Sequence, residues 1–111
     1  MNLDWLLSLW RKLFLRRPDF VLRWHEGDTP PEKLEQGVLL VASEDGELWA
    51  AAFLCPCKCG DRIELALIPE ATPHWHLTND AKNTPTLRPS VWRKTGCRSH
   101  FWLRDGRIHW C

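Results

Sequence analysis

The sequence predicts a small α+β domain that is mostly β: an antiparallel β-domain with a zinc site, preceded by one amphipathic helix. Three observations predict this class. Apolar residues recur with helical spacing in residues 3–16, several later segments alternate apolar and polar residues, and four of the five cysteines fall in two short stretches. We therefore expect an N-terminal amphipathic helix in residues 1–17 and a zinc-binding β-domain in residues 18–111.

Composition narrows the class of protein. The chain has 111 residues and a net charge of +1, so it lacks the strongly basic balance typical of nucleic-acid-binding proteins, and no nucleic acid is expected as a partner. It also lacks a positively charged leading region of the secretory type, which favours a cytoplasmic location. Eight tryptophans and no tyrosine are present, and we expect most of these indole rings to pack in the core.

The N-terminal segment has one apolar face. At 100° per residue, a single arc of the predicted helix carries Leu3, Leu6, Leu7, Leu9, Trp10, Leu13 and Phe14. Trp5 and Leu15 face the polar side instead, and Pro18 ends the helix. Two interpretations stay open: the helix packs on its own domain, or it contacts a partner protein or a membrane surface.

The β-domain is predicted from short alternating or apolar runs separated by turn residues. Two Asp-Gly pairs, Asp45-Gly46 and Asp105-Gly106, are typical of tight hairpin turns. We expect six or seven strands among the segments 20–25, 37–42, 48–54, 62–68, 74–77, 87–92, 100–103 and 108–110.

The two cysteine stretches predict a metal site. Residues 55–60 read Cys-Pro-Cys-Lys-Cys-Gly and residues 97–100 read Cys-Arg-Ser-His. Thiolates and imidazoles are the ligands that zinc prefers, and paired ligand groups at hairpin edges are typical of its sites. Five candidates compete for four positions: Cys55, Cys57, Cys59, Cys97 and His100. Either one is a bystander or the site leaves room for water; a disulfide such as Cys55 with Cys59 is the alternative, and spacing alone favours a structural ion.

A catalytic zinc would need a nearby group that handles protons. Glu47, Glu64, Ser90 and Ser99 are available, but no motif selects one of them.

Three stretches together carry a resemblance: residues 49–60, 85–92 and 96–102. They resemble a family of small bacterial proteins, formerly a domain of unknown function, often encoded beside ubiquitin-like proteins and their conjugating enzymes. The family is thought to contain zinc-dependent peptidases that process or remove ubiquitin-like proteins. The resemblance covers roughly residues 35–111, and members often have Gly at the position of Lys58.

The resemblance implies that Cys57, Cys59, Cys97 and His100, with Cys55 as a further candidate, hold the metal. It also implies hydrolysis of peptide or isopeptide bonds, in which a neighbouring group orients water or stabilises the oxyanion. Ser90 is our first candidate for this catalytic group, since it follows Pro89 and does not lie between two ligands as Ser99 does.

The expected function is therefore that of a zinc-dependent peptidase that acts on a ubiquitin-like protein or its conjugates. Two other functions stay open. One is a non-catalytic structural-zinc module that recruits a protein partner. The other, weaker one is nucleic-acid binding by the basic C-terminal third, where Trp92 and Trp102 are interleaved with Arg88, Arg93, Lys94, Arg98, Arg104 and Arg107.

Overall fold

The structure is a computed structural model of the chain, and it describes residues 4–6 and 17–111. Residues 4–6 are helical, with Trp5 and Leu6 exposed. The rest of the helix predicted in residues 3–16 lies outside the described residues, so its extent and its role stay predictions. In the described part of the chain, no helix is both long and apolar enough to cross a lipid bilayer.

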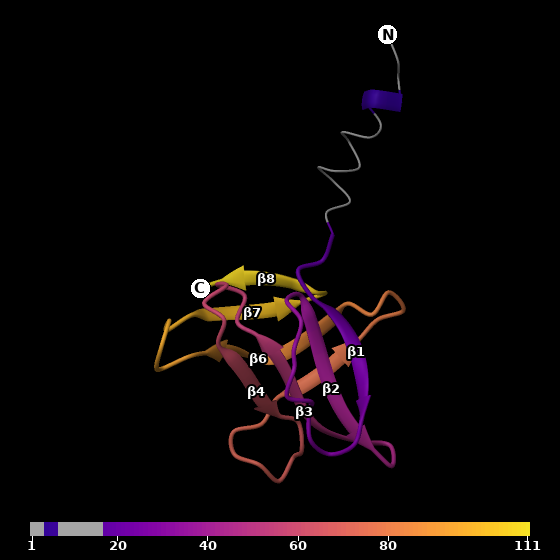
Figure 1. Cartoon of the computed structure of the whole chain (residues 1–111), viewed down its shortest axis with the longest axis vertical. Helices are drawn as coiled ribbons and strands as arrows, with labels where there is room; N and C mark the ends of the chain where they lie inside the picture. The colour runs from indigo at the N-terminus through magenta and orange to yellow at the C-terminus, as the bar shows by residue number, and fades with distance from the viewer. Residues whose placement is uncertain (1–3, 7–16) are drawn as a thin grey trace.

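The body of the protein consists of two four-stranded sheets (Figure 1). The first has the order β1-β2-β3-β4 and the second β5-β6-β7-β8. The strands are β1 (Val21–Glu26), β2 (Val38–Glu44), β3 (Glu47–Leu54), β4 (Arg62–Ala66), β5 (His76–Asn79), β6 (Pro85–Trp92), β7 (His100–Arg104) and β8 (Arg107–Trp110). The prediction of a mostly β domain is confirmed, with eight strands in place of six or seven.

One strand pair corrects the prediction of an antiparallel domain. Strand β1 pairs with β2 in parallel, whereas β2 with β3 and β3 with β4 are antiparallel, as are all pairs of the second sheet. A parallel pair needs a long connection that returns the chain to its starting edge. The polar, proline-bearing residues 27–37 provide that connection.

Phenylalanines, not tryptophans, occupy the centre of the core. Phe20 precedes β1, Phe53 lies in β3 and Phe101 lies in β7, and all three are buried. Their rings meet edge to face, with centroids 5.4 Å apart for Phe20 and Phe53 and 6.3 Å apart for Phe53 and Phe101. The three rings therefore join both sheets in one core. The expectation that most tryptophans pack there is wrong for the described ones, because the side chains of Trp5, Trp24, Trp92 and Trp110 are exposed.

The turn between β7 and β8 holds the start of the domain against the second sheet. The backbone N–H of Phe20 donates to the carbonyl of Gly106, whose own N–H donates to the carbonyl of Pro85, both at 2.8 Å. A side chain at position 106 would be crowded, because a Cβ there would lie 2.7 Å from the Phe20 carbonyl oxygen and 2.9 Å from Pro18 Cβ. Glycine is required here by space as well as by its φ of 74°.

This close approach predicts a difference between two similar turns. Gly46 also follows an aspartate, has φ of 80° and has no atom near the site of an added Cβ. Gly46→Ala should lower the free energy of unfolding by about 1–2 kcal/mol, the usual cost of a positive φ for a non-glycine residue. Gly106→Ala should lower the free energy of unfolding by about 1–3 kcal/mol more than Gly46→Ala, because the backbone of Phe20 must move to make room for the new Cβ. Urea denaturation of both variants measures the difference, and equal losses would contradict the close packing.

Candidate functional site

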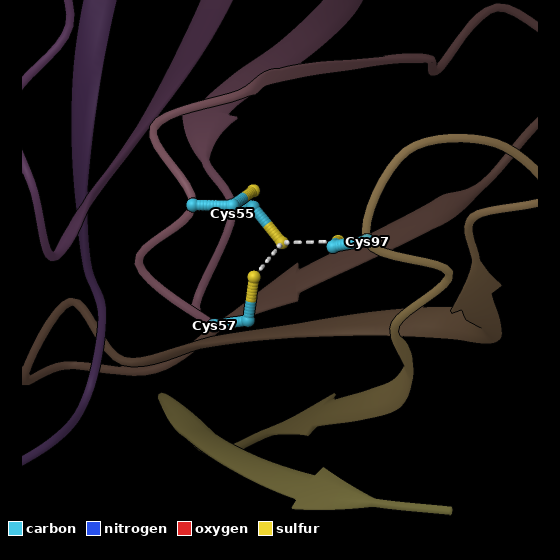
Figure 2. A group of neighbouring side chains, drawn as sticks. Cys55, Cys57 and Cys97 are labelled. Carbon is cyan, nitrogen blue, oxygen red and sulfur yellow. Dashed lines mark hydrogen bonds between the residues drawn. The ribbon is translucent and has the colours of Figure 1, made fainter.

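Four cysteine thiols converge where the two cysteine stretches meet. Cys55, Cys57 and Cys59 come from the loop after β3, and Cys97 comes from the loop between β6 and β7. Figure 2 shows Cys55, Cys57 and Cys97 turned toward one another. Their four Sγ atoms all lie within 4.8 Å of one another. Cys55 Sγ is 3.4 Å from Cys57 Sγ and 3.6 Å from Cys97 Sγ. We call this group the four-thiol cluster.

Local backbone geometry turns the first three thiols toward one point. The N–H of Lys58 donates to the carbonyl of Cys55 at 3.0 Å, and the N–H of Cys55 donates to the carbonyl of Asp61 at 2.8 Å. This tight loop places Lys58 at φ 69° and Gly60 at φ 88°. A left-handed backbone at position 58 is a conformation that glycine adopts more easily than lysine.

The spacing of the cluster fits zinc. Four sulfurs at ~2.3 Å from a tetrahedral ion are separated by roughly 3.8 Å, close to the two short Sγ–Sγ distances. A disulfide would require about 2.05 Å, and all five cysteines are free thiols. The alternative of a Cys55–Cys59 disulfide is therefore absent from the structure. The four-thiol cluster could hold a metal ion such as zinc without any imidazole ligand.

The thiols of the cluster differ in how readily they ionise. Burial raises the pKa of the Cys55 thiol. Hydrogen bonds from the Ser99 hydroxyl, and then from its backbone N–H, lower the pKa of Cys97 to about 6, so this thiol ionises readily. Arg93 Nη1 lies 3.4 Å from Cys97 Sγ and 3.0 Å from Asp61 Oδ2, so the guanidinium joins the two loops electrostatically.

His100 lies outside the four-thiol cluster, beside Ser90. A hydrogen bond of 2.9 Å joins Ser90 Oγ to His100 Nε2. The sequence analysis predicted His100 as a candidate metal ligand and Ser90 as the catalytic group; in the structure these two side chains contact each other. A serine hydroxyl within hydrogen-bond reach of an imidazole is the arrangement that activates a serine nucleophile.

An irregularity in β6 creates this pair. Leu87 is paired with Leu103 and Val91 with Phe101, so residues 88–90 of β6 lie opposite the single residue Trp102 of β7. A bulge of this kind bends its strand and redirects side chains. Here it brings the Ser90 hydroxyl within hydrogen-bonding distance of His100, the first residue of β7.

Two tryptophans position the pair. The Trp92 ring stacks on the imidazole of His100, with centroids 5.0 Å apart and planes 15° from parallel. Trp75 Nε1 donates a hydrogen bond of 3.3 Å to the backbone carbonyl of Ser90. In the described part of the chain, no carboxylate forms a hydrogen bond with His100. In the described residues, the His100 ring is therefore contacted by a stacked indole and not by a carboxylate.

The other sequence candidates lie elsewhere. The Ser99 hydroxyl is 3.2 Å from Cys97 Sγ, so it belongs to the four-thiol cluster. Glu64 lies on β4 and pairs with Arg62 at 2.8 Å, and Glu47 begins β3; both are in the first sheet. Cys111 is an exposed free thiol. The roles of Trp75 and Trp92 were not foreseen, since no sequence motif marks a ring that stacks on an imidazole.

Comparison with known proteins identifies the family. No curated protein and no solved structure gives a significant match. One family model, described as bacterial ubiquitination-like system serine protease (BubE), matches residues 26–111. The description specifies a serine protease, whereas the sequence prediction was a zinc-dependent peptidase; the predicted link to a ubiquitin-like system agrees. The chain belongs to this family of proteases of bacterial ubiquitination-like systems.

Proposed function

We propose that Ser90 is the nucleophile and His100 the general base of a peptidase that processes or removes a ubiquitin-like protein. The observation that carries the proposal is the 2.9 Å contact between Ser90 Oγ and His100 Nε2. The family's description as serine proteases supports it, because Ser90 is the serine paired with an imidazole in the described residues. Both side chains are partly exposed, so a substrate can reach them.

The chemistry follows from this contact. His100 Nε2 accepts the Ser90 hydroxyl proton while Oγ attacks the scissile carbonyl carbon, which forms a tetrahedral intermediate. The intermediate collapses to an acyl-enzyme, and His100 returns the proton to the leaving amine. Water then attacks the ester with His100 as base, which releases the acid product and restores the Ser90 hydroxyl.

The imidazole is oriented by stacking in this proposal. The face of Trp92 fixes the plane of the His100 ring, and the hydrogen bond from Trp75 fixes the backbone of Ser90. Both tryptophans act on the geometry of the pair and do not exchange protons. They are positioning residues in the mechanism.

We further propose that the four-thiol cluster holds a structural zinc ion. Four thiolates would fill its tetrahedron, so a bound zinc supplies a crosslink between two loops. The loop that carries Cys97 starts after Trp92 and ends at His100, and its ends are joined by a 2.8 Å hydrogen bond from the Arg93 N–H to the Ser99 carbonyl. Fixing Cys97 would therefore restrain the loop that leads from Trp92 to His100. A cytoplasmic location is part of the proposal, since reduced thiols persist there.

The nucleophile can be tested on a fusion of a reporter to the C-terminus of a ubiquitin-like protein from a bacterial ubiquitination-like system. Ser90→Ala should lower the cleavage rate by about a thousandfold or more while retaining bound metal. A fluorophosphonate probe should label Ser90 in the parent protein, as located by mass spectrometry. Ser43→Ala on β2 is the matched control and should cleave normally. Full activity of Ser90→Ala would exclude the serine mechanism and favour a reaction at the zinc ion. Absence of cleavage by the parent protein would favour a non-catalytic module.

Metal removal should act through structure. We expect one zinc ion per chain by atomic absorption, lost on chelation and in Cys97→Ser, with a fall in both the melting temperature and the cleavage rate. Cys111→Ser is the control because that thiol is outside the cluster, and it should retain zinc, stability and activity. If metal-free protein kept its stability but lost all activity, a structural role for the ion would be wrong.

Removal of the stacking ring should slow the chemical step. Trp92→Ala is expected to lower kcat about fivefold, from a stacking energy of about 1 kcal/mol, with little change in KM. Trp92→Phe should recover most of the rate. The matched control is Trp24→Ala on β1, because the exposed fractions are similar: 54% for Trp24 and 58% for Trp92. A loss that appears only in KM would show that Trp92 binds substrate instead.

A further inference from the structure

A basic groove lies on the second sheet next to the Ser90–His100 pair. It has a volume of about 870 Å³. Its walls come from β5, β6 and β7, and the lining residues used below are His76, Thr78, Arg88, Pro89, Trp102 and Arg104. We call this the basic groove.

The groove is continuous with the proposed catalytic pair. Pro89 lines it and is the chain neighbour of Ser90. Trp102 lies opposite the bulge that carries Ser90, and it is two residues from His100 on β7, so both side chains are on the same face of the strand. A peptide whose scissile bond lies at Ser90 would therefore extend into this groove.

Positive charge dominates the groove. Arg88 and Arg104 are exposed in it, and no carboxylate is among its described lining residues. Within residues 4–6 and 17–111, neither guanidinium has a carboxylate partner. The Arg104 guanidinium lies over the Trp102 ring, 4.6 Å from its centroid, which leaves its N–H edge available for a ligand.

Strand geometry gives the distance between the catalytic pair and the two arginines of the groove. A strand rises ~3.3 Å per residue, so Arg104, four residues after His100, is about 13 Å along β7 from the catalytic pair. Arg88 is two residues from Ser90 on β6. An extended substrate rises by the same amount per residue, so its side chains two to four residues from the scissile bond would reach the two guanidiniums.

We propose that the basic groove binds the extended substrate segment next to the scissile bond and selects acidic side chains two to four residues from it. This inference rests on the proposed function, because it takes Ser90 as the point of cleavage. Aspartate or glutamate would pair with Arg88 and Arg104, and Trp102 with Pro89 would contact the substrate backbone and stems.

A single-stranded nucleic acid is the competing ligand, since arginines beside aromatic rings also bind bases and phosphates. The position of the groove favours the peptide. Arg93, in the loop after β6, is already paired with Asp61 at 3.0 Å. Arg88 and Arg104 instead line the groove together with Pro89, the chain neighbour of Ser90, so they lie where a peptide cleaved at Ser90 would extend.

The test measures binding, so that it does not depend on catalysis. The full-length, metal-loaded Ser90→Ala protein is titrated against two fluorescein-labelled ten-residue peptides that differ only by two aspartates in place of two asparagines. Fluorescence anisotropy should show about tenfold tighter binding of the acidic peptide, a preference that weakens with added salt. Arg88→Gln and Arg104→Gln should each weaken its binding about three- to fivefold, and the double variant should abolish the preference.

Arg23→Gln on β1 is the matched control, because it removes the same charge from the first sheet and should leave the preference unchanged. Zinc content and circular dichroism verify that each variant is folded. Equal affinity for the two peptides, or no binding of either, would overturn the groove proposal, as would tighter binding of a ten-nucleotide single-stranded DNA. Cleavage by the parent protein is scored separately, so loss of the serine mechanism and loss of the groove's selectivity give different results.

Discussion

The convergence of four thiols is the constraint on which the site depends. Cys55 is fully buried at the end of β3, so one side of the four-thiol cluster is fixed to the core. Cys97 is exposed, in a loop whose other residues are polar or glycine. In the proposed arrangement a bound metal ion would tie that loop to the core, and His100 follows Cys97 by only three residues. The hydrophobic core of a small domain contributes little stability to such an exposed loop, and a metal crosslink can provide that stability.

The parts of the fold that depend on local chemistry were predictable. Asp45-Gly46 and Asp105-Gly106 form hairpin turns because both residues of each turn have positive φ. Buried and more exposed side chains alternate along β4 around Leu65. This alternation was also predictable, because successive side chains of any strand point to opposite faces of the sheet. The parallel pairing of β1 with β2 and the division into two sheets depend on contacts between distant residues, which carry no local pattern. The prediction that most tryptophans are buried failed because the size of a ring does not determine which face of its strand packs on the core.

The convergence of the four thiols was predictable, and the contact between His100 and Ser90 was not. The spacing of Cys55, Cys57, Cys59 and Cys97 predicts a metal site because zinc needs close sulfurs on short loops. A Cys-x-x-His pair fits the same rule, yet Cys97 lies in a loop and His100 begins a strand, so their side chains diverge. The bulge that brings Ser90 to His100 adds two residues to β6 relative to β7. No residue type marks that insertion in the sequence.

The surplus of candidate ligands has a physical explanation in the proposed mechanism. A fifth ligand would be redundant in a tetrahedral sphere, which the four thiolates already complete. His100 could join a metal through Nε2 only by giving up its 2.9 Å contact with Ser90 Oγ. Because the thiolates suffice, the imidazole is free to act as a base on the outer face of the second sheet, beside the basic groove. The proposal thus assigns structural and catalytic tasks to two sides of one short loop, and a metal in the four-thiol cluster would influence the reaction by holding that loop in place.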